Sequence, residues 1–194
     1  MAWLCGEEAS IPDVIGRELE RKVFNAAVSG AYFTDELSGE TGMDIREQYI
    51  EQAWDWLVID GGANDLNEEC GCDACDGELD AIITADGSAG ALPELVSAAV
   101  GQGVRVVILG YYNVPDTAEY GFADCNDLID EYSARQELLA AAEPDVWYVD
   151  GREAFSPSDL DAYDDDHAHP SALGAQLIGE AIAAQILAAE AGDS

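Results

Sequence analysis

The two histidines of the chain, His167 and His169, lie in one short acidic motif, DHAHP, which runs from Asp166 to Pro170. A carboxylate three residues before an imidazole can bind one ring nitrogen and fix the tautomer, which leaves the other nitrogen to act as a general base. The proline restricts the backbone and starts a helix, so the imidazole before it projects from a stiff point. The motif predicts His169 as a base oriented by Asp166. An exposed acidic loop with two solvated histidines is the alternative interpretation.

Two other motifs could stabilise negative charge on a reacting oxygen. The sequence GAND, residues 62–65, directly follows an apolar run, and the amide of Asn64 could donate a hydrogen bond to an oxyanion. Asp65 is expected to tie down the loop. Gly30 ends the sequence NAAVSG, and its backbone N–H could serve the same oxyanion. Ordinary turns after strands are the alternative for both motifs, because Gly, Asn and Asp are common there.

The elements that must position these motifs alternate between strand and helix along the chain, which predicts an α/β domain with a parallel sheet. Ser10, followed by a proline and an acid, predicts a helix start. Ligands of open parallel sheets bind at the carboxyl ends of the strands, where the three motifs fall. No repeat or linker divides the sequence, so residues 1–194 are expected to form one domain. The expected strands are 22–28, 56–60, 104–109 and 146–149, and the expected helices are 10–21, 44–54, 78–85, 92–102, 123–142 and a final helix from about 171.

In this order the three motifs resemble the conserved blocks of the SGNH/GDSL hydrolase family, and the resemblance runs from about Ala2 to the last helix. It implies a three-layer, flavodoxin-like α/β fold with a mostly parallel sheet, and hydrolysis of a small ester or acyl group by a serine mechanism. By the same resemblance His169 is the catalytic base and Asp166 its orienter, with Asn64 and Gly30 in the oxyanion hole. The substrate is then a small-molecule ester, and neither a metal nor a cofactor is required.

The sequence departs from this family at its start. The family opens with a strand ending in Gly-Asp-Ser, whose serine is the nucleophile, whereas Met1–Trp3 resemble the residues that follow this serine. We therefore expect the first strand and the nucleophile to lie before Met1, and these 194 residues to be inactive or nearly so. Ser10 as a helix cap and Ser29 as a loop residue are not expected to replace it. The Gly-Asp-Ser at residues 192–194 follows an alanine-rich helix, which argues against circular permutation.

Two other functions compete with the hydrolase. The first is a catalytically inactive module that binds an acyl or carbohydrate ligand in the same crevice. The second is a metal protein built on cysteine ligands. A structural zinc site usually uses two spaced pairs of ligands, whereas this chain has a single dense cluster, so a local disulfide staple or reduced thiols are favoured over metal. The five cysteines are Cys5, Cys70, Cys72, Cys75 and Cys125.

The charge of the chain is extreme, with 41 acidic residues against 7 basic ones and a net charge of −34. Such a surface repels nucleic acid and anionic lipid, so neither is expected as a partner. No stretch approaches the roughly 20 apolar residues that a membrane span needs, and the first ten residues show no secretory signal. Salt weakens the repulsion between these charges, which suggests adaptation to a salt-rich habitat, with a merely acidic mesophilic proteome as the alternative.

Overall fold

The computed structural model describes residues 9–34 and 42–192 of the chain. At its centre lies a three-stranded parallel sheet in the order β1-β2-β3. The register pairs Val58 with Val107, and Val107 with Trp147. Continuous apolar runs suit a parallel sheet, because helices cover both of its faces. The strands are β1 (Trp56–Ile59), β2 (Arg105–Leu109) and β3 (Val146–Val149).

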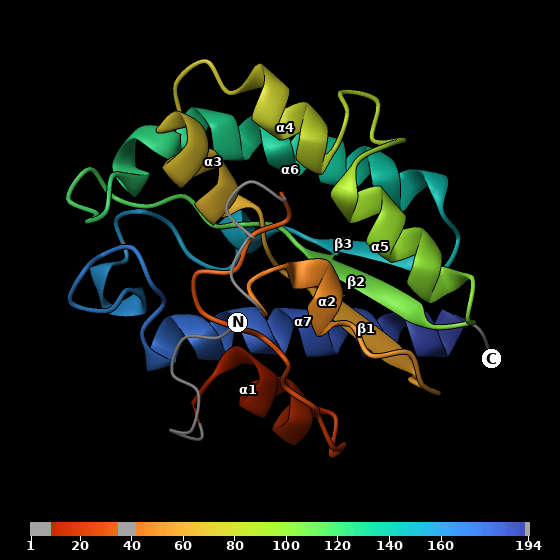
Figure 1. The fold of residues 1–194 in the computed structure, drawn as a ribbon. Coiled ribbons are helices and arrows are strands. Elements are labelled where there is room, and N and C mark those ends of the chain that lie inside the picture. The colour runs from red at the N-terminus through yellow and green to blue at the C-terminus, as the bar shows by residue number, and fades with distance from the viewer. Residues whose placement is uncertain (1–8, 35–41, 193–194) are drawn as a thin grey trace.

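Helices cover the two faces of the sheet and give a three-layer α/β fold (Figure 1). One face carries α3 (Ala63–Cys70), α4 (Asp76–Ile82), α5 (Ala91–Val100) and α6 (Asn126–Ala142), and the other carries α1 (Ile11–Glu18) and α7 (Ala172–Gly192). The short helix α2 (Ile45–Gln48) packs into the first of the two cores beside β1. Three 3-10 helices lie in the connections, namely η1 (Phe122–Cys125), η2 (Gly151–Glu153) and η3 (Leu160–Ala162).

Most of the predicted elements are confirmed. The three strands expected after residue 50 form within one residue of their predicted bounds, and the four helices expected after residue 75 are present. Helix α1 begins at the predicted Ser10 cap, whose hydroxyl accepts the N–H of Asp13, while the Asp13 carboxylate accepts hydrogen bonds from Ser10. This reciprocal cap fixes where the helix starts.

Three local predictions are wrong. Residues 22–28 form no strand: they pair with no described strand, and Phe24 and Val28 are exposed. The helix expected over 44–54 ends at Gln48, because the backbone of Tyr49 is extended. The alternative given for GAND, an ordinary turn after a strand, is also wrong, because these residues form the first turn of α3, which begins at Ala63.

Helix α7 corrects the expectation that no segment could span a membrane, since it is long and apolar enough by length and composition. In the fold, however, α7 packs against α1 and the sheet. The side chains of Ile178, Ile182 and Ile186 on its inner face are almost inaccessible to solvent. This burial identifies α7 as a core helix of the domain.

Strand β1 pairs with β2 on one side and with no described strand on the other. A cavity of about 230 Å³, here called the β1 groove, runs along this outer edge between β1, α1 and residues 22–27. At the groove the rings of Phe24 and Trp54 stack with their centroids 5.8 Å apart. Because one side of β1 borders the groove, Trp56, Leu57 and Val58 are only half-buried, although burial on both faces was expected.

Candidate active site

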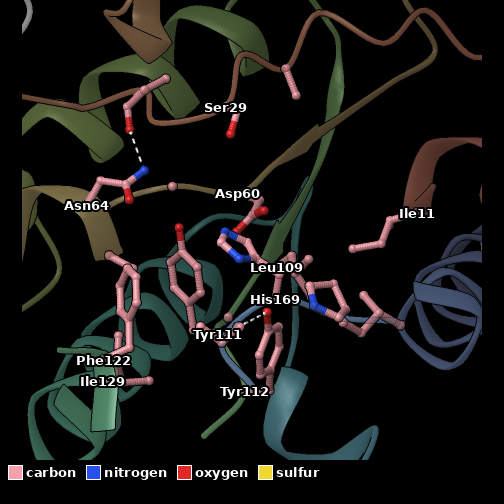
Figure 2. Close-up of a pocket in the computed structure, with 18 of the residues that line it drawn as sticks. Ile11, Ser29, Asp60, Asn64, Leu109, Tyr111, Tyr112, Phe122, Ile129 and His169 are labelled. Atoms are coloured by element: carbon pink, nitrogen blue, oxygen red, sulfur yellow. Dashed lines mark hydrogen bonds between the residues drawn. The ribbon is translucent and has the colours of Figure 1, made fainter. Parts of the chain in front are cut away.

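The three sequence motifs meet at one pocket at the carboxyl ends of β1 and β2. Gly30, Asn64 and His169 all line this pocket, which has a volume of about 150 Å³. Figure 2 shows Ser29, Asp60, Asn64 and His169 around it. Asp166, the fourth predicted site residue, is hydrogen-bonded to the ring of His169. Residues distant in the sequence are thus brought together where ligands of parallel sheets bind.

Asp166 holds His169 through both carboxylate oxygens. Its Oδ2 lies 2.7 Å from the ring Nδ1 of His169, and its Oδ1 accepts the backbone N–H groups of Ala168 and His169, each at 2.9 Å. Burial by itself would raise the pKa of Asp166, but the hydrogen bonds from His169 and Ala168 outweigh it and lower this pKa below its ordinary value. The carboxylate is therefore ionised at neutral pH and orients the imidazole.

The loop that carries the histidine is anchored on both sides. The N–H of Asp164 donates to the carbonyl of His169 at 2.8 Å, and the hydroxyl of Tyr112 donates to the carbonyl of Ala168 at 2.9 Å. Ser171 accepts the N–H of Gly174 at 3.3 Å at the start of α7. His167, by contrast, is not among the residues that line the pocket, and its ring Nδ1 lies 2.7 Å from the Thr117 hydroxyl.

Asn64 lies in the first turn of α3, which starts directly after two glycines. At Gly62, where φ is 108°, an added Cβ would lie 2.7 Å from the hydroxyl oxygen of Tyr132, so a side chain is excluded there. The Asn64 amide donates one hydrogen bond to the carbonyl of Ala31 at 3.2 Å, drawn as a dashed line in Figure 2. A side-chain amide carries two hydrogens, so Asn64 has a second one to offer to a ligand.

Asp65 anchors the segment that follows Gly30, which is the structural role expected from the sequence. Its Oδ1 accepts the N–H groups of Phe33 and Thr34, each at 2.8 Å. The side chain is fully buried, and burial raises the pKa of Asp65 to about 6 although these hydrogen bonds lower it. Gly30 itself has φ 76°, a conformation that favours glycine.

Several walls of the pocket were not predicted as functional. Asp60 follows β1 directly and lines the pocket, a position that its place at the end of a strand could have indicated. Tyr111 and Tyr112 also line it. Their place in the loop after a strand allowed either a border of the pocket or aromatic packing within the loop, and packing was the favoured interpretation. Burial, with the nearby charge of Asp60, raises the pKa of both tyrosines well above its ordinary value, so their hydroxyls stay neutral. The Tyr120 ring lies edge-on to the His169 ring, with centroids 6.1 Å apart.

Two disulfides, Cys70–Cys75 and Cys72–Cys125, tie the end of α3 to its surroundings. The first closes the local staple that the cysteine cluster predicted. The second reaches to η1, where Cys125 lines the pocket. Four thiols are thereby used in disulfides, and Cys5 lies outside the described residues.

Comparison with known proteins agrees with this geometry. The model of the GDSL-like lipase/acylhydrolase family matches residues 5–177, which include all three motifs. A search among curated proteins gave no match.

Proposed function

Because the chain belongs to the GDSL-like lipase/acylhydrolase family, we propose that it forms the site of a hydrolase that cleaves a small ester by a serine mechanism. One observation supports the proposal most: His169, held by Asp166, lines the same pocket as Asn64 and Gly30. The pocket volume of about 150 Å³ favours a short acyl group, since a cavity of roughly this volume holds a ligand the size of benzene.

Each residue has one role in this mechanism. The Nε2 of His169 takes the proton of the attacking serine and later gives it to the leaving alcohol. Asp166 holds Nδ1–H and stabilises the imidazolium that forms. Asn64 and Gly30 donate hydrogen bonds to the oxyanion of the tetrahedral intermediate, and one such donor contributes about 3–4 kcal/mol.

We further propose that the serine lies on a strand that fills the β1 groove. The support is the groove itself, which lies along the side of β1 that pairs with no described strand and is bordered by residues 22–27. Backbone groups at a strand edge need hydrogen-bond partners, and an added strand would supply them. A strand parallel to β1 would end beside the pocket, near His169. The hydroxyl of Ser10 is used in the cap of α1, and Ser29 belongs to the loop beside Gly30.

The experiment compares hydrolysis of p-nitrophenyl acetate by two proteins. The first is the chain of 194 residues, and the second carries an apolar strand ending in Gly-Asp-Ser fused directly before Met1. We expect little or no turnover by the first, clear turnover by the second, and loss of that turnover in His169→Ala. Turnover by the shorter chain that His169→Ala abolishes would refute the upstream nucleophile. A folded, extended protein that binds esters without turnover would instead support the acyl- or carbohydrate-binding module.

A further inference from the structure

Among the described residues that line the pocket, Asp60 is acidic, several are aromatic, and the one basic side chain is the imidazole of His169. Asp60 lines it at the end of β1, and Asp166 lies behind His169. Among the described residues that line the pocket there is no lysine and no arginine. An anionic group on a ligand would therefore meet the carboxylate of Asp60, and no lysine or arginine among the described lining residues could pair with it.

The single lysine and the six arginines of the protein do not line the pocket. Lys22, the sole lysine of the sequence, lines the β1 groove. Each of the six arginines forms an ion pair with a carboxylate outside the pocket, so none is a ready partner for a bound anion. The pairs are Arg17 with Glu18, Arg21 and Arg105 with Glu190, Arg46 with Asp44, Arg135 with Asp80, and Arg152 with Asp150.

Tyr120 holds an aromatic ring beside His169 at a conformational cost. Its φ of 61° lies in the left-handed region that residues with a bulky side chain rarely adopt, and 63% of its surface is exposed. The amide of Asn67 holds it by donating to the Tyr120 carbonyl at 2.9 Å. In this position the ring lies edge-on to His169. An exposed aromatic ring held in this way is suited to contact a ligand, and aromatic faces attract cations.

We propose that the site selects esters whose alcohol part carries a positive charge, such as a quaternary ammonium group. This inference rests on the proposed function, because it assigns the substrate class of that same pocket. His169 must reach the leaving oxygen to protonate it, so the alcohol part of the ester lies beside His169 and hence beside Tyr120. There a cation meets the ring of Tyr120 and the negative potential of Asp60 and Asp166.

The test measures binding of three matched ligands by following the ring resonances of His169 in NMR titrations. The ligands are the methyl-ketone analogue of acetylcholine, in which a methylene replaces the ester oxygen so that nothing is hydrolysed, and two relatives of it. In one a tert-butyl group replaces the trimethylammonium group, and in the other a sulfonate does. We expect the cation to bind about tenfold more tightly than the neutral ligand, and the anion at least about tenfold more weakly, with both ratios shrinking in high salt.

Equal affinities for the three ligands would overturn the inference. A different outcome contradicts the proposed function: if even the neutral and cationic ligands leave the His169 resonances unmoved at saturating concentration, the pocket is not an acyl site. The two failures are thus distinguishable.

Four variants separate the local effect from the general charge of the protein. Asp60→Asn and Glu94→Gln each remove one negative charge, but Glu94 is exposed on α5 and does not line the pocket. We expect only Asp60→Asn to reduce the cation-to-neutral affinity ratio, by about threefold to fivefold. Tyr120→Phe keeps the aromatic ring, so we expect it to leave the cation-to-neutral affinity ratio unchanged. Tyr120→Leu removes the ring and should lower this ratio by about threefold. Equal effects of Asp60→Asn and Glu94→Gln, or no effect of Tyr120→Leu, would contradict the roles assigned to Asp60 and Tyr120.

Discussion

One carboxylate, that of Asp166, binds His169 twice: Oδ2 lies 2.7 Å from the ring Nδ1, and Oδ1 accepts the backbone N–H at 2.9 Å. The two contacts fix the position of the ring relative to the backbone that carries it. The carboxylate is also the more buried partner, with 12% of its side chain exposed against 32% for the imidazole. The ring can therefore reach the pocket while its orienting group stays shielded from solvent.

Replacing Asp166 by asparagine should cost stability in a way that depends on pH. The folded state lowers the pKa of Asp166, so its contribution is complete above the ordinary carboxyl pKa of about 4 and is lost as the pH falls through the lower folded value. We expect Asp166→Asn to lower the free energy of unfolding by about 2 kcal/mol at pH 7. Urea unfolding as a function of pH checks this. The difference in unfolding free energy between Asp166→Asn and the wild type should shrink in acid. A difference that grows on acidification would contradict the lowered pKa of Asp166.

Asp65 should show the opposite pH dependence. Burial raises its pKa to about 6, so the folded state binds the proton more tightly than the unfolded chain does. The stability contributed by this group therefore falls as the pH rises from about 4 to about 6, by up to about 3 kcal/mol, and is constant above that range. In Asp65→Asn the amide oxygen still accepts the N–H groups of Phe33 and Thr34, but no charge is buried. The free energy of unfolding should therefore depend less on pH between about 4 and 6.

The control for this prediction is Asp116→Asn, which removes a carboxylate from an exposed loop position. It should leave the pH dependence of the unfolding free energy between about 4 and 6 unchanged, because this exposed side chain is not part of the buried segment that Asp65 anchors. If both variants change the pH dependence of the unfolding free energy equally, the burial of Asp65 is not the cause of that dependence.

The two disulfides should stabilise the fold unequally. Cys72 and Cys125 are separated by 53 residues and Cys70 and Cys75 by 5. The loss of chain entropy in the unfolded state grows with loop length, which predicts about 4 kcal/mol for the long loop and about 2 kcal/mol for the short one. Denaturant unfolding of Cys72→Ala/Cys125→Ala and of Cys70→Ala/Cys75→Ala measures both. A larger loss from the second pair would contradict this ranking.

Salt should stabilise the protein because it screens the repulsion within a chain of net charge −34. We expect the melting temperature at pH 7 to rise steadily from low to molar salt. Near pH 4, where many carboxylates are protonated, the rise should be smaller. A melting temperature that does not respond to salt at pH 7 would rule out salt adaptation.

The sequence predicts best what is decided locally. The continuous apolar runs at β2 and β3 predicted buried strands, and both strands are present. The cap of α1 involves only Ser10 and Asp13, which lie three residues apart. Residues 22–28 have a comparable apolar pattern, but a strand exists only where a neighbouring strand pairs with it, and the described residues supply none. The pattern therefore indicated an extended conformation without being able to show pairing.

The residues of the candidate site also differ in how far the sequence could predict them. His169, Asp166, Asn64 and Gly30 could be proposed because their motifs are short and follow strand ends. For Tyr120 the sequence left two interpretations open, a border of the pocket or aromatic packing within its loop, because its position depends on the contact with Asn67, 53 residues earlier in the chain. Asp60 also follows the end of a strand, but it is one of 41 acidic residues, and the fold shows that it lines the pocket.

The protonation of the His169 ring tests the central claim most directly, since a general base must present an unprotonated Nε2 to the pocket. Long-range nitrogen–proton NMR spectra, recorded about two pH units above the ordinary histidine pKa of about 6.5, report which nitrogen carries the proton. We predict a proton on Nδ1, hydrogen-bonded to Asp166, and its loss from that position in Asp166→Asn. A proton on Nε2 in the wild-type protein would contradict the assignment of His169 as the base.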